Sequence, residues 1–164
     1  MRIIHAFIVA LLLAVAVPSV ATADTFNFST AGVKFDAPSG WTSSKEEGVL
    51  VIAPKDGSLA LVFVGLRASD LDAAGKELDA ALAEDFTHIK EKGSAEELSI
   101  NGMPALAAEA TAKSKEDGSA VELGMVLVQT KSGRFMLILG VADAKNPDKH
   151  DAAVLKLIQS IRPM

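Results

Sequence analysis

Residues 121–142 read VELGMVLVQTKSGRFMLILGVA, two long apolar runs on either side of a polar turn at 131–133. In each run, apolar residues occupy both of the alternating positions that a strand turns to its two faces. The first run sets Val126 and Val128 against Leu123, Met125 and Leu127, and the second sets Met136 and Ile138 against Phe135, Leu137 and Leu139. Strands that are buried on both faces lie in the middle of a covered sheet. This stretch therefore predicts two paired central strands, with helices covering both faces of their sheet.

The first covering helix is predicted to begin after Ser69 or Asp70, either of which can serve as its N-cap. We expect it to end at Gly93, because glycine favours the left-handed conformation that follows many helices. Its apolar stripe, at 3.6-residue spacing, comprises Leu71, Leu78, Leu82, Phe86 and Ile89. Gly75 lies within this stripe, although glycine weakens a helix by about 1 kcal/mol relative to alanine. We therefore expect Gly75 to permit close approach of the helix to the sheet.

A second covering helix is predicted near the end of the chain. Asn146 can cap it, with Pro147 in the favoured first position. Its apolar stripe comprises Val154, Leu157, Ile158 and Ile161. Further strands are expected at 25–29, 33–36, 50–53, 59–66, 97–100 and 103–112, with Asp56-Gly57 and Asn101-Gly102 as hairpin turns. The sequence thus predicts an α+β fold, an α/β/α sandwich whose mostly antiparallel sheet has a helix on each face.

The first 23 residues have the pattern of a cleavable secretory signal peptide. Arg2 gives a positive start, residues 3–17 are almost wholly apolar, and Ala21-Thr22-Ala23 is an A-x-A cleavage site. The apolar stretch is shorter than the roughly 20 residues of a spanning helix, and no basic cluster follows it. We expect cleavage between Ala23 and Asp24, no stable membrane anchor, and a soluble product in the periplasm or outside the cell. That product, residues 24–164, is predicted to be a single domain.

Composition limits the partners of this product. The chain has no cysteine, which excludes disulfides and thiolate chemistry. Without Arg2, 15 of the 16 basic residues remain against 21 acidic ones, a net charge of −6. Such a charge disfavours nucleic acid and anionic membranes as partners.

The segment Phe35-Asp36-Ala37-Pro38-Ser39-Gly40-Trp41 resembles the early strand, Pro-x-Gly-Trp turn and tryptophan of Mog/PsbP-like proteins. The predicted order of strands, helix, β-meander and closing helix is similar to theirs over nearly all of residues 24–164. The resemblance implies an α/β/α sandwich. It also implies an accessory or adaptor role rather than an enzymatic one, and it assigns no metal or partner residues.

One local grouping of polar residues stands out in the first predicted helix. Glu84 and His88 are four residues apart, so both can face one ligand, and Asp85 lies at the edge of the apolar stripe. One interpretation is a metal or proton site. The other is a helix-surface pair worth about 0.2–0.5 kcal/mol. We expect no metal and no cofactor, because zinc needs at least three firm protein ligands.

His150 and Trp41 are the remaining candidate ligand-binding residues. His150 is expected near the start of the second helix beside Asp148 and Asp151, as a ligand contact or as a half-packed histidine. Trp41, the single tryptophan, is expected to plug one end of the core or to line an apolar pocket.

Three functions follow as hypotheses. The chain has no cysteine and no Gly-x-Ser-x-Gly motif, and after cleavage only two histidines remain. This favours a non-enzymatic exported accessory or binding protein that acts through its surface on a protein partner. An alternative is a carrier of a lipid or other apolar small molecule, and a further alternative is a carboxylate-based hydrolase. An apolar cavity near Trp41 and Gly75 is the feature expected of the carrier.

Overall fold

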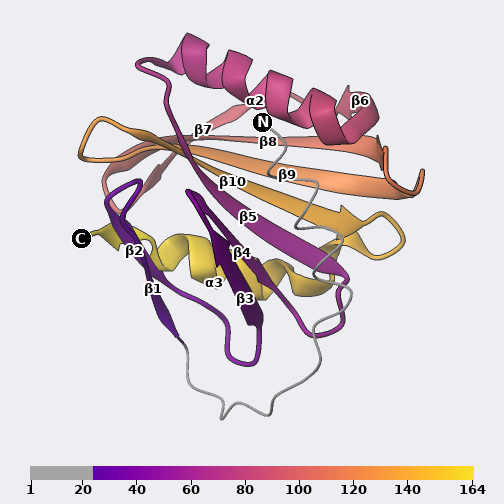
Figure 1. The fold of residues 1–164 in the computed structure, drawn as a ribbon, viewed down its shortest axis with the longest axis horizontal. Helices are drawn as coiled ribbons and strands as arrows, with labels where there is room; N and C mark the ends of the chain where they lie inside the picture. The colour runs from indigo at the N-terminus through magenta and orange to yellow at the C-terminus, as the bar shows by residue number, and fades with distance from the viewer. Residues whose placement is uncertain (1–23) are drawn as a thin grey trace.

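Two antiparallel sheets and two helices make up residues 24–164, the part of the chain described by this computed structural model (Figure 1). The predicted signal peptide lies outside these residues. The large sheet has the strand order β3-β4-β5-β10-β9-β8-β6, and β7 also pairs with β8. Its strands are β3 (Thr42–Glu46), β4 (Val49–Ala53), β5 (Leu59–Leu66), β6 (Phe86–Glu91), β7 (Glu96–Ile100), β8 (Met103–Ser114), β9 (Ala120–Gln129) and β10 (Phe135–Asp143). The small sheet consists of β1 (Thr25–Phe28), β2 (Val33–Asp36) and β11 (Arg162–Pro163).

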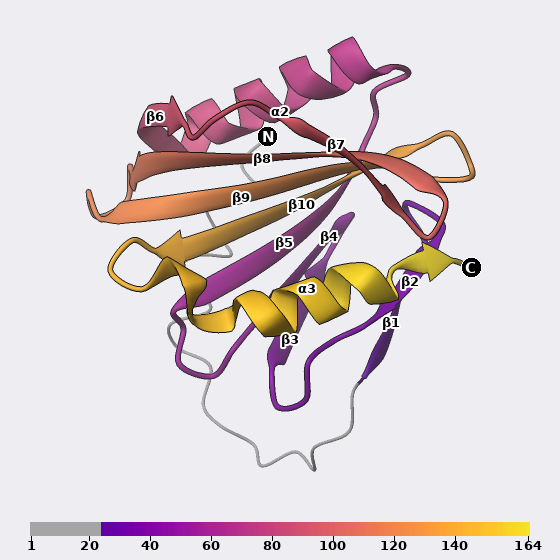
Figure 2. The same cartoon turned by 180° about the vertical axis from the view of Figure 1, so that it is seen from behind.

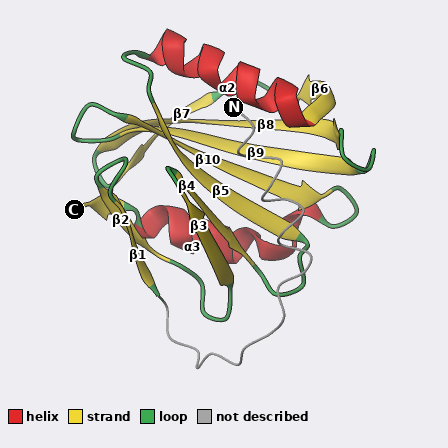
Figure 3. Ribbon diagram, viewed as in Figure 1, coloured by secondary structure: helices red, strands yellow, loops and turns green. Residues whose placement is uncertain are grey.

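The helices lie on opposite sides of the large sheet, as Figures 2 and 3 show. They are α2 (Leu71–Asp85) and α3 (Asp151–Ser160), and the short 3-10 turn η1 (Pro147–His150) precedes α3. Each helix closes a separate apolar core: Leu157 and Ile161 belong to one, Ala74 and Leu82 to the other. The predicted α+β sandwich is therefore confirmed. Neither helix of residues 24–164 has the length and apolarity needed to span a membrane.

The β9–β10 hairpin behaves as its sequence predicts. The strands pair in register from Phe135 opposite Gln129 to Asp143 opposite Val121. Met136 and Ile138 contribute to the core under α3, and Leu137 and Leu139 to the core under α2. The Asn101-Gly102 turn is confirmed too, with φ of 49° and 78°, the positive pair that such hairpins need.

The first helix is shorter than predicted. It ends at Asp85, and residues 86–91 continue directly as β6 along β8. Because Lys115 in the β8–β9 turn donates its backbone N–H to the Asp85 carbonyl at 2.9 Å, this turn fixes the point where the helix ends. The predicted stripe fails at both ends, since Leu71 is 47% exposed and Ile89 is 38% exposed. Gly93 therefore lies beyond β6 and does not end the helix.

Three further predictions are wrong in detail. The prediction placed all strands in one sheet, but β1, β2 and β11 form a second sheet on the α3 side. It also missed β3, a polar strand at the edge of the large sheet. At the second helix, the Asn146 side chain makes no capping hydrogen bond, and Pro147 begins η1 rather than α3.

The close approach that was expected between the first helix and the sheet at Gly75 is found instead at Gly65, where another segment lies against the sheet. A Cβ on Gly75 would have no atom within 4 Å, whereas a Cβ on Gly65 would overlap the Thr30 side chain. Gly65 lies on β5, and Thr30 lies in the turn between β1 and β2. The absence of a side chain at Gly65 thus allows the small sheet to pack closely against the large one.

Replacing Gly65 with alanine is expected to lower the free energy of unfolding by about 1–3 kcal/mol, the usual effect of overpacking. The substitution Thr30→Ala should recover part of this loss, because it removes the overlapping methyl group. Urea melts of the two single variants and the double variant measure the coupling. Additive effects would show that Thr30 is not the obstacle.

Candidate functional site

The residues that form the predicted Glu84, Asp85 and His88 site do not converge. Glu84 and Asp85 end α2, where Asp85 is only 5% exposed, whereas His88 is exposed on β6. His88 has a φ of 54° and lies in the β-bulge between Thr87 and Lys90, so the helical i, i+4 spacing does not exist. Among residues 24–164, no three His, Asp or Glu side chains are placed to hold a metal ion.

His150 belongs to a polar cluster that joins η1 to the β4–β5 turn. Its Nε2 lies 3.0 Å from Ser58 Oγ and 3.2 Å from Asp56 Oδ2. The Ser58 hydroxyl donates to Asp56 Oδ1 at 2.6 Å, and the Lys149 ammonium lies 2.8 Å from Asp56 Oδ2. The Trp41 ring meets the imidazole edge-on, with centroids 5.5 Å apart.

This serine, histidine and aspartate do not form a nucleophilic relay. In such a relay one ring nitrogen accepts the serine proton while the other donates to the carboxylate. Here the Ser58 proton goes to Asp56, and both contacts of His150 use Nε2, which is then the donor. The cluster therefore works as a clamp between two loops.

The clamp has a pH signature. The Lys149 ammonium, followed by the Ser58 hydroxyl, holds the pKa of Asp56 well below its ordinary value of 3.8. Because this pKa is lower in the folded than in the unfolded chain, ionised Asp56 stabilises the fold above the ordinary value. That contribution is lost as the pH falls below about 4. Urea midpoints at pH 6 and pH 3 should differ less for Asp56→Asn than for the parent. The same substitution at Asp79, exposed on α2, is the control, and an equal effect of both would contradict the assignment.

Trp41 is partly buried and packs against the core on the α3 side. Its side chain lines neither the open space between α3 and the sheet nor the one between α2 and the sheet. Since Gly75 lies on α2, Trp41 and Gly75 are on opposite sides of the large sheet. The single cavity expected near both residues is therefore not formed.

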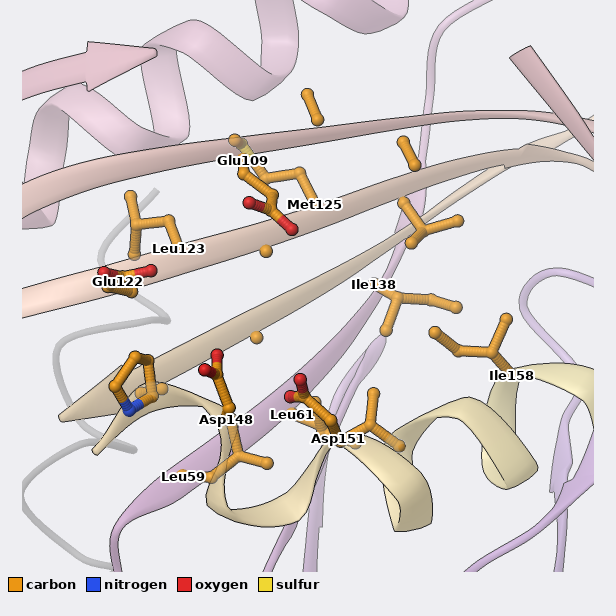
Figure 4. Close-up of a pocket in the computed structure, with 18 of the residues that line it drawn as sticks. Leu59, Leu61, Glu109, Glu122, Leu123, Met125, Ile138, Asp148, Asp151 and Ile158 are labelled. Carbon is orange, nitrogen blue, oxygen red and sulfur yellow. The ribbon is translucent and has the colours of Figure 1, made fainter. Parts of the chain in front are cut away.

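An open groove runs between η1–α3 and the part of the large sheet that α3 leaves uncovered (Figure 4). Its volume is about 230 Å³. Gly124 and Gly140 pair directly across β9 and β10 and form its floor. A Cβ on Gly124 would meet no atom within 4 Å, so the missing side chain leaves this space open. We call this site the α3 groove.

Apolar side chains surround the floor, and carboxylates form the rim. The apolar side chains are Leu59, Leu61, Val126, Ile138, Val154 and Ile158. The rim carries Glu109 from β8, Glu122 from β9, Asp148 from η1 and Asp151 from α3, on the two sides of one opening in Figure 4. Among residues 24–164, Lys92 is the one cation that lines the groove.

Sequence reasoning missed this groove, although one signal was present. Glu122, Gly124 and Val126 share one face of β9. The polar and small residues at the start of that face indicated that no helix covers it.

A second hollow lies between the N-terminal half of α2 and the other face of the sheet. It consists of two adjoining cavities of about 450 and 420 Å³. The cavities share Leu71, Leu106 and Leu127, and Gly75 lines one of them. We call this hollow the α2 crevice.

Comparison with known proteins shows a fold rather than a function. No protein-family model matches this sequence, and no curated protein matches it. The solution structure of the cyanobacterial PsbP protein CyanoP from Synechocystis has a TM-score of 0.63 and 14% identity. The match covers 93% of this chain and 99% of CyanoP.

Two crystal structures are also similar. One, from Bacteroides thetaiotaomicron, has a TM-score of 0.57 and 15% identity, covering 87% of this chain and 48% of that one. The other is PA94 of Pseudomonas aeruginosa, a protein of unknown function, with a TM-score of 0.53 and 11% identity, covering 76% and 97%. The chain thus has a PsbP-like α+β fold, a large antiparallel sheet with two helices.

Proposed function

We propose that this chain is an exported, non-enzymatic member of the Mog/PsbP-like superfamily that binds part of a protein partner in the α3 groove. The observation that carries the proposal is the pair of facing glycines, Gly124 and Gly140, at the bottom of an open space between helix and sheet. A close-packed sandwich would fill this position with side chains. A concave apolar surface with a few polar groups at its rim is the usual form of a binding site.

The non-enzymatic part of the proposal draws on the two histidines. His88 is exposed at a bulge, and His150 donates from Nε2 within a loop clamp. The hydrolase hypothesis needs two or more carboxylates around one of these histidines. Among residues 24–164, Asp56 is the one carboxylate within hydrogen-bonding distance of His150, so the hypothesis gains no support.

The experiment compares two glycine substitutions that fill different hollows. Gly124→Leu fills the α3 groove and Gly75→Leu fills the α2 crevice, and at both positions a Cβ has open space around it. Crosslinking in the exported fraction should attach a partner protein to the parent and to Gly75→Leu, but not to Gly124→Leu. Unchanged crosslinking of Gly124→Leu would refute binding in the groove, provided that its urea melt matches the parent.

A second candidate function, the carrier of an apolar small molecule, is favoured by the α2 crevice. Its combined walls are rich in leucine, and the first half of α2 stands away from the sheet at Gly75. Cavities of this size lie in the range that holds drug-sized ligands. Native mass spectrometry of the parent should then show an extra mass that Gly75→Leu loses and Gly124→Leu keeps. A bare mass for the parent would count against the carrier.

A further inference from the structure

This inference rests on the proposed function and names the group that the groove recognises. We infer that the α3 groove binds a cationic side chain of the partner protein, a lysine or arginine whose methylene stem lies over Gly124 and Gly140.

The rim has a strong excess of negative charge. Four carboxylates, from Glu109, Glu122, Asp148 and Asp151, face one ammonium, that of Lys92. Lys92 Nζ lies 2.8 Å from Glu122 Oε2 and 3.7 Å from Glu109 Oε2. Within residues 24–164, neither Asp148 nor Asp151 forms a direct ion pair with a basic side chain, so two carboxylates remain available for direct contact with a second cation.

The N-terminus of α3 is a competing influence, because a helix N-terminus by itself favours an anion. Here Asp148 and Asp151 already occupy that end of the helix. Two full negative charges outweigh the half positive charge of a helix dipole. An incoming anion is therefore repelled, and an incoming cation is attracted.

The contacts and the pKa of Lys92 show the effect of the rim on a cation. Its pKa is raised above 10.5, first by its hydrogen bond to Glu122 and also by the charges of Glu122, Glu109 and Asp148. Desolvation acts in the opposite direction and is overcome. The rim thus stabilises an ammonium group at its edge.

The floor suits the stem of such a side chain. Lysine and arginine lay their methylene groups along apolar surface and keep the charged end in polar surroundings. The groove offers this sequence of environments, from Val154 and Ile158 at the apolar wall to Asp148 and Asp151 at the rim. Its 230 Å³ is below the range of pockets for drug-sized ligands and matches one long side chain better than a lipid.

The test is an NMR titration of the 15N-labelled protein with three short peptides. The probe is acetyl-Leu-Lys-Leu-amide, and the matched peptides replace lysine with uncharged norleucine or with glutamate. We expect the lysine peptide to shift the amide signals of Gly124 and Gly140 at least tenfold more strongly than either matched peptide. Salt should weaken its binding, because it screens exposed charges.

Two variants locate the charge. Asp148→Asn combined with Asp151→Asn should weaken binding of the lysine peptide about tenfold or more. Glu46→Gln combined with Glu47→Gln, two exposed carboxylates at the end of β3 and in the turn after it, should leave it unchanged. Equal loss in both double variants would reduce the effect to net charge and overturn the inference.

The remaining outcomes separate this inference from the proposed function. Equal binding of the norleucine peptide would overturn cation recognition while leaving the groove as a binding site. Absence of any shift from the lysine peptide, with the partner still crosslinked to the parent but not to Gly124→Leu, would likewise overturn only the inference. A response to n-pentylamine as strong as that to the peptide would show that the ligand is a free amine rather than a side chain of a partner protein, and would overturn the inference.

Discussion

Replacing Phe63 with alanine is expected to lower the free energy of unfolding by about 3–5 kcal/mol, the range for a large core side chain. Phe63 lies on β5, is 0% exposed, and stacks on Phe35 of β2 with ring centroids 4.4 Å apart. This stack joins the small sheet to the large one. Its removal leaves a cavity that both sheets line, and the close packing around it limits collapse.

Urea denaturation followed by circular dichroism measures this loss. Phe26→Ala is the matched control, because Phe26 is only partly buried and lies 6.0 Å from Phe35 at the rim of the same stack. We expect the control to lose much less stability than Phe63→Ala. Similar losses in the two variants would show that the contact between the sheets does not depend on Phe63.

The second large effect is expected from Leu82→Asp. Leu82 is 5% exposed on the buried face of α2. An aspartate there would place an unpaired charge in an apolar core. Burying that charge costs about 3–5 kcal/mol, and the chain can avoid this cost only by unfolding. Thermal melts should show a strongly lowered midpoint or no cooperative transition.

Leu71→Asp is the control for this prediction, since it makes the same change on the same helix. Leu71 is 47% exposed and begins α2, where the helix dipole stabilises a negative charge. We expect a change within about 0.5 kcal/mol, as for most surface substitutions. If both variants melt alike, the orientation of α2 on the sheet is wrong.

These two leucines also show which part of the first helix could be predicted from the sequence and which part could not. Leu71, Leu82, Phe86 and Ile89 all fit one helical stripe. The apolar stripe continues past Asp85 in the sequence, but the helix does not, because residues 86–91 pair with β8 instead. Unpaired strand edges are costly, and this pairing satisfies one. Helical spacing alone holds no information about such a distant edge.

The functional candidates divide in the same way. Glu84 and His88 were grouped by helical spacing, and the grouping failed with the helix. His150 was named from residue type as a ligand contact or a half-packed histidine, and its partner in the structure, Asp56, is 94 residues away. The α3 groove draws its rim from four separate elements, and its floor depends on the register that sets Gly124 beside Gly140.

Local sequence patterns were enough to predict the α+β sandwich, the central β9–β10 hairpin with both of its faces, and the two covering helices. These features follow from periodicity and turn chemistry, which act over a few neighbouring residues. The end of α2, the second sheet, and the positions of the α3 groove and the α2 crevice could not be predicted in this way. Those features depend on strand register and on which surfaces remain uncovered, and both are set by contacts between segments far apart in the chain.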